Sequence, residues 1–138
     1  AYVRPAQGAL AEAPVEASPD VGVADLPNDV LIVEDNMIIA LDAESSLLRA
    51  GIETVRVASS VAQAMRAIAS RPPAFALLDI NLGRETSFAV AEHLDSLAIP
   101  FVFTTGYGED IAFPPKLLGV PRIRKPYTGD ALLMAMRR

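Results

Sequence analysis

The stretch "FALLDINLG", residues 75–83, decides the fold, because it places a carboxylate at the end of an apolar run. Four apolar residues precede Asp79, and Asn81 and Gly83 follow it. A short, continuous apolar run of this kind is typical of a strand that is buried on both faces. A carboxylate at the tip of such a strand is costly unless it is paired, so Asp79 is the first candidate for a functional group.

The composition limits the classes of protein and site that need to be considered. The chain has 138 residues, of which 51% are hydrophobic, so it is long enough for one domain with a substantial core. The formal net charge of -5 argues against a nucleic acid as a direct partner, because such partners favour a basic surface. The absence of cysteine excludes disulfide and thiol chemistry, and His93, the single histidine, cannot form a histidine metal site by itself.

Residues 1–27 differ in composition from the rest of the chain. This segment is rich in alanine and proline and has no sustained hydrophobic period, which indicates a flexible tail or an interdomain linker. A docking segment for a partner is the alternative, and residues 28–138 form the predicted domain. No apolar run approaches the roughly 18 residues that span a membrane, and no signal-peptide pattern stands at the start, so we expect a cytoplasmic protein without membrane contact.

Beyond residue 28, strand-like apolar runs alternate with segments of helical period. In the first helical segment Ile38, Leu41 and Leu48 recur at helical spacing, and Gly51 follows where a C-terminal glycine is common. Continuous apolar strands separated by helices predict a doubly wound α/β fold, a five-stranded parallel sheet with helices on both faces. The expected strands are 29–35, 53–58, 75–79, 99–106 and 120–127, and the expected helices are 36–51, 59–70, 86–98 and 128–138.

Polar side chains gather at the carboxyl ends of the expected strands. In doubly wound folds ligands bind beyond these ends, so residues that directly follow a strand are the first candidates for a site. Strand order and twist would bring these ends together on one edge of the sheet. The polar residues at these positions are Glu34, Asp35, Asp79, Thr104, Thr105 and Lys125.

These residue types in combination indicate phosphoryl chemistry. Three carboxylates that lie close together repel one another unless a cation joins them, and hard oxygen ligands suit Mg²⁺. Lys125 and a threonine hydroxyl can each bind a phosphoryl oxygen. Asp79 is the candidate nucleophile, because carboxylates can form aspartyl phosphates.

Four blocks of the sequence, "LIVEDN", "LLDINLG", "FTTG" and "RKPY", resemble in order and spacing the signature blocks of the response-regulator receiver domain of two-component signalling. The resemblance covers residues 29–138. It implies a flavodoxin-like fold with strand order 2-1-3-4-5. It also implies a Mg²⁺ site, in which Asp35 and Asp79 bind the ion directly, Glu34 binds through water, and Asn81 provides its backbone carbonyl.

The resemblance implies a phosphorelay. Asp79 would take a phosphoryl group from a sensor histidine kinase or a histidine phosphotransfer protein. Thr105, preferred to Thr104 because a small residue follows it, would turn its hydroxyl towards the phosphoryl group, and Lys125 would bind it, aimed inward by a cis bond to Pro126. Such a domain is a signalling phosphoacceptor for an effector protein, and it is no enzyme beyond its own phosphotransfer and slow dephosphorylation.

The sequence departs from the receiver pattern at two places. Arg122 stands where many receivers have an aromatic switch residue, and Pro114 and Pro115 interrupt the expected fourth helix, which we therefore expect to be short or mobile. "FTTGYG" resembles a receiver subgroup with an FxTGY-type motif. In that case Tyr107 would replace the aromatic switch, and the segment 107–119 would become ordered on phosphorylation.

Two alternatives belong to other functional classes. An aspartate-nucleophile phosphatase would need a second acid two residues after the nucleophile, where this chain has Asn81. A pseudo-receiver that only binds partners would be expected to lose pocket residues, and this chain keeps them. The cognate kinase, the output, the oligomeric state, the phosphate lifetime and the choice between a single-domain regulator and part of a longer protein remain open at this stage.

Overall fold

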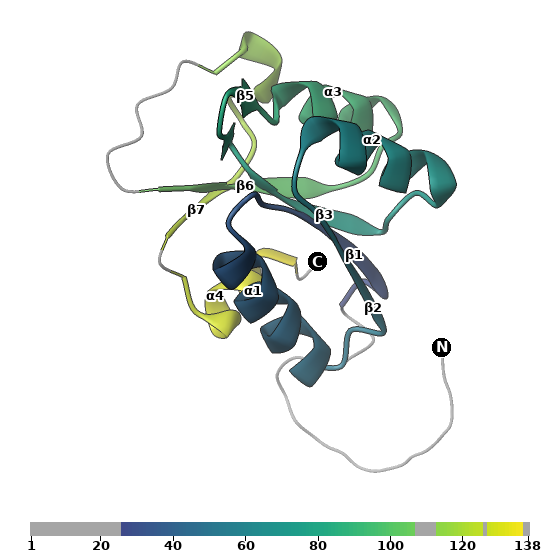
Figure 1. Ribbon diagram of the computed structural model, residues 1–138, viewed down its shortest axis with the longest axis vertical. Coiled ribbons are helices and arrows are strands. Elements are labelled where there is room, and N and C mark those ends of the chain that lie inside the picture. Colours follow the sequence, from purple (N-terminus) through teal and green to yellow (C-terminus); the bar gives the residue numbers. More distant parts are fainter. Residues whose placement is uncertain (1–25, 107–112, 126, 137–138) are drawn as a thin grey trace.

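The computed structural model describes residues 26–106, 113–125 and 127–136. It contains a five-stranded parallel sheet in the order β2-β1-β3-β6-β7 (Figure 1). Because β6 and β7 are the fourth and fifth strands of this sheet along the chain, the predicted order 2-1-3-4-5 is confirmed. A separate two-stranded hairpin, β4–β5, follows β3. The strands of the main sheet are β1 (Asp29–Val33), β2 (Thr54–Ala58), β3 (Phe75–Asp79), β6 (Phe101–Thr105) and β7 (Arg122–Arg124).

Four α-helices cover the two faces of the sheet among the described residues (Figure 1). Helices α2 and α3 lie on one face, and α1 and α4 lie on the other, as a doubly wound fold requires. None of the helices in the described ranges is long and apolar enough to span a bilayer. The helices are α1 (Met37–Arg49), α2 (Val61–Ser70), α3 (Phe88–Ser96) and α4 (Gly129–Met136).

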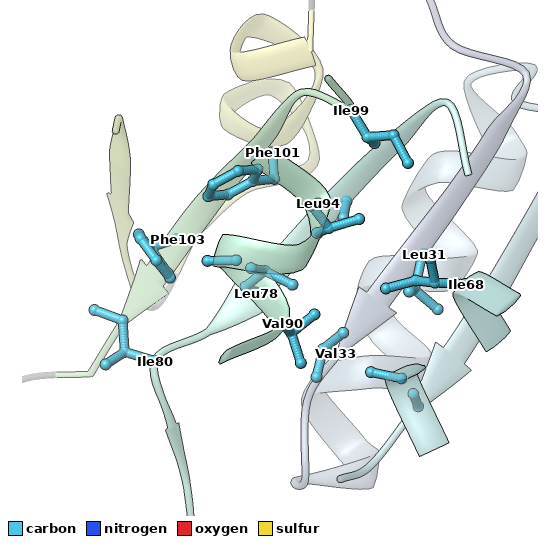
Figure 2. Close-up of a cluster of buried hydrophobic side chains, with 14 of the residues drawn as sticks. Leu31, Val33, Ile68, Leu78, Ile80, Val90, Leu94, Ile99, Phe101 and Phe103 are labelled. Carbon is cyan, nitrogen blue, oxygen red and sulfur yellow. The ribbon is translucent and has the colours of Figure 1, made fainter. Parts of the chain in front are cut away.

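The core consists of two layers, because successive residues of each strand point to opposite faces of the sheet. One layer joins the strands to α2 and α3, and Figure 2 shows Leu31, Val33 and Leu78 from the strands beside Ile68 and Leu94 from the helices. The other layer packs against α1 and α4 and includes Val30, Ile32, Leu77, Val102, Leu47 and Leu132. Both faces of β1 and β3 are therefore buried, as their continuous apolar runs predicted.

Helix α1 begins and ends close to the predicted positions, and its buried side chains are not the ones that showed the helical spacing in the sequence. Asn36 caps the helix by accepting hydrogen bonds from the backbone N–H groups of Ile38 and Ile39, and Gly51 has a φ of +105°. Ile38 and Leu41 are 82% and 54% exposed, whereas the buried side chains are Ala40, Ala43 and Leu47. The spacing thus predicted the helix correctly, and the residues that showed it lie largely on the exposed side of the helix.

The segment before β7 contains only a 3₁₀ turn, Pro115–Leu117, within the part that the structure describes. Pro115 stands at the start of this turn, where the missing N–H does no harm. The prediction of a short fourth helix is therefore confirmed for residues 113–119. Tyr107 and the rest of 107–112, the tail 1–25 and Pro126 lie outside the described residues.

A two-stranded antiparallel hairpin after β3 was not predicted. It consists of β4 (Asn81–Leu82) and β5 (Glu85–Thr86), and the backbone N–H of Ser87 closes its base by donating to the carbonyl of Ile80 at 3.0 Å. Gly83, in the turn of the hairpin, has a φ of +78°, a backbone conformation that residues with a Cβ rarely adopt.

Charged side chains at the amino end of the sheet join three segments of the chain. The Arg56 guanidinium donates to both carboxylate oxygens of Asp29 at 3.2 Å, and Arg71 Nε donates to the same carboxylate at 2.9 Å. Arg56 also donates to the backbone carbonyls of Ala67 and Arg71. This amino-edge cluster, Asp29, Arg56 and Arg71, connects β1 and β2 to the end of α2.

Asp29→Ala tests the contribution of the amino-edge cluster. The substitution leaves the partly buried Arg56 without its bidentate partner, so we expect the free energy of unfolding to fall by about 2–4 kcal/mol. Urea denaturation followed by circular dichroism measures the loss. Glu53→Ala removes an exposed acid at the same end and should change stability by less than about 0.5 kcal/mol. Equal losses of stability in the two variants would show that the amino-edge cluster makes no specific contribution to the free energy of unfolding.

Candidate functional site

The carboxyl ends of β1, β3 and β7 bring three of the predicted site residues into contact. Glu34 follows β1, Asp79 ends β3, and Lys125 follows β7. Lys125 Nζ lies 2.9 Å from Glu34 Oε1 and 3.2 Å from Asp79 Oδ2. Glu34 and Asp79 are 2% and 4% exposed, so this lysine is the cation that allows two carboxylates to be buried side by side.

Asp35 completes a cluster of acids that could hold a metal ion. Glu34, Asp35 and Asp79 each offer a carboxylate oxygen, and these oxygens lie within 4.8 Å of one another. Asp35 is exposed while the other two are buried, so the cluster is open to solvent on one side. A set of carboxylate oxygens alone fits a hard divalent cation such as Mg²⁺ better than a softer transition metal.

Backbone N–H groups orient the buried carboxylates. The N–H of Asn36 donates to Glu34 Oε2 at 3.2 Å, and the N–H of Asn81 donates to Asp79 Oδ1 at 3.4 Å. In both cases the donor lies two residues after the acid: Asn36 is the N-cap of α1, and Asn81 is the first residue of β4. Asn81 is exposed at the start of the hairpin, next to Asp79. Its predicted role, a backbone carbonyl for the metal, stays a prediction.

The threonines of β6 link the lysine to the centre of the sheet. The backbone carbonyl of Thr105 accepts a hydrogen bond of 2.7 Å from the N–H of Lys125. Thr104 lies opposite Asp79 in the strand register and is buried, while Thr105 is half-buried at the end of the strand. Thr105, which the sequence analysis preferred, is thus the more accessible of the two threonines. The role of its hydroxyl stays a prediction.

The cluster shifts the pKa values of its own members. Burial, together with the hydrogen bond and the negative charge of Glu34, raises the pKa of Asp79 from 3.8 to about 7, and Lys125 opposes this shift. Burial alone would lower the pKa of Lys125, but its contacts with Glu34 and Asp79 outweigh burial and raise that pKa, so the lysine is charged. Without a metal ion, the site therefore tends to hold a proton near neutral pH.

Tyr127 and Gly83 lie beside the cluster, and the sequence did not identify them as site residues. Burial and the negative charges of Glu34 and Asp79 raise the pKa of the Tyr127 phenol. A Cβ added to Gly83 would lie 3.7 Å from Asp35 Oδ2, which places the hairpin turn against this acid. Each stands two residues after a predicted site residue, Tyr127 after Lys125 and Gly83 after Asn81, and this proximity in the sequence could have identified them.

A cation–π contact takes the place of the aromatic switch residue. The Arg122 guanidinium lies 3.9 Å from the ring centre of Phe113. That ring is partly buried and lies 5.3 Å from the ring centres of both Phe88 and Phe103, so the arginine covers one side of an aromatic cluster in which Phe103 is fully buried. Arg122 thus has a structural partner within the described residues, while Tyr107, the predicted substitute for the switch, lies outside them.

Solved structures share this architecture. SdrG from Sphingomonas melonis Fr1 is 37% identical, with a TM-score of 0.68 over 78% of this chain and 92% of that one. The receiver domain of NtrX from Brucella abortus is 26% identical, with a TM-score of 0.64 over 77% of this chain and 92% of that one. The receiver (REC) domain of the PhyR response regulator from Erythrobacter litoralis is 26% identical, with a TM-score of 0.64 over 81% and 88%.

Comparison with known sequences identifies a regulator as a relative of this chain. No family model matches the chain. The phyllosphere-induced regulator PhyR of Methylorubrum extorquens is 34% identical over 89 residues, which are 62% of this chain and 33% of that protein. The matched part of the chain thus spans about a third of the length of this relative.

The strand order and the acid–lysine site at the carboxyl edge define a receiver-type α/β domain. The chain belongs to the response-regulator receiver family, as the resemblance of its four sequence blocks had indicated.

Asp79→Asn tests the electrostatics of the metal-free site. The pKa of Asp79 is higher in the folded protein than in the unfolded chain, so the wild type loses stability as the pH rises from about 4 to about 7. The variant lacks this loss. Near pH 4 the ionisation of Asp79 should therefore contribute little to any difference in the free energy of unfolding between the two proteins. At pH 8 the variant should be more stable by on the order of 2–4 kcal/mol.

The measurement is chemical denaturation in EDTA at several pH values. Asp95→Asn, a matched change at an exposed acid on α3, should follow the wild type at every pH. A difference between Asp79→Asn and the wild type that does not change with pH would show that Asp79 carries no raised pKa.

Proposed function

We propose that this chain is a phosphoacceptor module of a two-component phosphorelay. It takes a phosphoryl group from the phosphohistidine of a sensor kinase or a phosphotransfer protein onto Asp79, and it changes conformation in response. The observation that supports this most directly is the buried Asp79 carboxylate, held by Lys125 within a cluster of three acids.

The site has the groups that this reaction needs. An oxygen of Asp79 attacks the phosphorus, the P–N bond of the donor breaks, and its electron pair returns to the imidazole, which leaves an acyl phosphate on Asp79. Attack requires the ionised carboxylate. Mg²⁺ bound by Glu34, Asp35, Asp79 and the carbonyl of Asn81 would neutralise the acids and coordinate the phosphoryl oxygens.

Lys125 connects the reaction to the rest of the fold. Its Nζ now contacts Glu34 Oε1 at 2.9 Å and Asp79 Oδ2 at 3.2 Å, and a phosphoryl group on Asp79 would compete for the same cation. The backbone N–H of Lys125 donates to Thr105 at 2.7 Å, so a shift of the lysine would reach the end of β6. In this proposal the Thr105 hydroxyl turns towards the phosphoryl group from that strand end.

The exposed face of α1 would receive the protein that donates the phosphoryl group. Met37, Ile38 and Leu41 are 49%, 82% and 54% exposed, and they follow directly after the Asp35–Asn36 loop. A donor must bring its phosphohistidine within bonding distance of Asp79, so it must cover surface next to this loop. Apolar side chains exposed there would be buried by such contact.

Beryllofluoride with Mg²⁺ tests the phosphoacceptor function, because it imitates an aspartyl phosphate without a kinase. In amide NMR spectra we expect shifts at residues 34–35, 79–83, 104–106 and 125 in the wild type. Asp79→Asn should lose the response to beryllofluoride. A flat response of the wild type to both ligands would contradict the proposal and favour a pseudo-receiver that only binds partners, while turnover of small phosphate esters would favour a phosphatase.

Lys125→Ala separates phosphoryl binding from the conformational response. We expect beryllofluoride shifts near Asp79 to persist, since the acids remain, while the shifts at Thr105 are reduced at least about twofold because the link through Lys125 is lost. The same NMR titration measures both. Lys116→Ala removes an exposed lysine and should leave both sets of shifts intact. An unchanged response at Thr105 would remove Lys125 from the switch.

A further inference from the structure

Glu85 ties the hairpin after β3 to helix α2. Its Oε2 accepts a hydrogen bond of 3.0 Å from the backbone N–H of Val61, the first residue of α2. The N–H groups of a first helical turn have no partner within the helix, and the helix dipole favours a negative charge there. Ser60, the N-cap, uses its hydroxyl to accept from Gln63 instead, so Glu85 serves a donor that the cap does not.

The other side of the hairpin lies against the acidic cluster. The Gly83 turn lies next to Asp35, since an added Cβ would be 3.7 Å from Asp35 Oδ2. Asn81 pairs with Thr86, and Leu82 pairs with Glu85, in the two-residue ladder. The hairpin therefore lies between α2 and Asp35, and Glu85 holds its α2 side.

The hairpin depends on such external contacts. An isolated pair of two-residue strands has little stability of its own in water. Leu82 is 5% exposed and anchors one side of the ladder in the core, but Asn81, Gly83 and Glu85 are exposed. A contact that joins the exposed side to a helix restricts the positions that Asn81 can take.

We propose that Glu85 is a positioning residue for the metal site, acting through the hairpin on the backbone carbonyl of Asn81. This inference rests on the proposed function, in which Asn81 helps to hold Mg²⁺. Glu85 does not belong to the acidic cluster itself, which consists of Glu34, Asp35 and Asp79. Its effect passes along the ladder, from Glu85 and Leu82 to Asn81.

Three variants separate position from charge. Glu85→Ala removes both the hydrogen bond and the negative charge, whereas Glu85→Gln removes the charge but keeps an acceptor oxygen for the Val61 N–H. Ser60→Ala weakens the start of α2 without touching the hairpin. If Glu85 acts by position, only the first variant should weaken Mg²⁺ binding substantially.

The experiment is a Mg²⁺ titration of each full-length variant, followed by amide NMR. We expect Glu85→Ala to raise the dissociation constant about 3–10-fold, less than the loss typical of a direct partner of a metal ligand. Glu85→Gln and Ser60→Ala should stay within about twofold of the wild type. In the metal-free protein, the amide signals of Val61, Asn81 and Gly83 should move in Glu85→Ala.

The outcomes distinguish this inference from the function on which it rests. If the wild type binds no Mg²⁺, the proposed function fails and this inference with it. If the wild type binds Mg²⁺ and Glu85→Ala binds it equally well, only the positioning role is overturned. It is also overturned if Glu85→Gln loses as much affinity as Glu85→Ala, which would indicate charge alone, or if Ser60→Ala does so, which would indicate helix stability alone.

Discussion

The ion pairs of Lys125 with Glu34 and Asp79 are the interaction on which the rest of the site depends. Two carboxylates at the ends of neighbouring buried strands would otherwise repel each other in a region from which water is largely excluded. The lysine that compensates them comes from the edge of the sheet, two strands away from Asp79. Its backbone hydrogen bond to Thr105 keeps it there, so the charge balance of the centre depends on the pairing of β7 with β6.

This arrangement leaves the lysine with more than one partner at the centre of the site. Lys125 contacts two acids on different strands, and neither contact is exclusive. In the proposed function, a phosphoryl group on Asp79 would change the partners that are available to Lys125. Arg122, in β7 and three residues before Lys125, places its guanidinium over the ring of the partly buried Phe113.

Much of the fold and the centre of the site could be predicted from the sequence. Continuous apolar runs such as "FALLD" occur where a strand is buried on both faces, and parallel strands place their carboxyl ends on one edge. Glu34, Asp79 and Lys125 therefore had to lie near one another once the strand order was right. The alternation of strands and helices predicted a parallel sheet, while the strand order was predicted from the resemblance of the four sequence blocks to receiver domains, and the structure has that order.

The remaining features have no periodic signal. Helix α1 buries Ala40 and Ala43 together with Leu47, while the larger Ile38 and Leu41 are exposed. Hydrophobicity alone ranks the two alanines below the two exposed residues. The hairpin is too short for any alternation to be recognised, and the bond between Glu85 and Val61 joins segments 24 residues apart, which no local pattern records.

The amino-edge cluster gives the two ends of the sheet opposite electrical properties. At that end Asp29 is matched by two arginines, and the arrangement is closed by hydrogen bonds to backbone carbonyls. At the other end Lys125 contacts Glu34 and Asp79, and the third acid of the cluster, Asp35, is exposed. The amino-edge cluster therefore carries more positive than negative side chains, while the cluster at the carboxyl end carries more negative ones, so an approaching cation is drawn towards the carboxyl end of the strands.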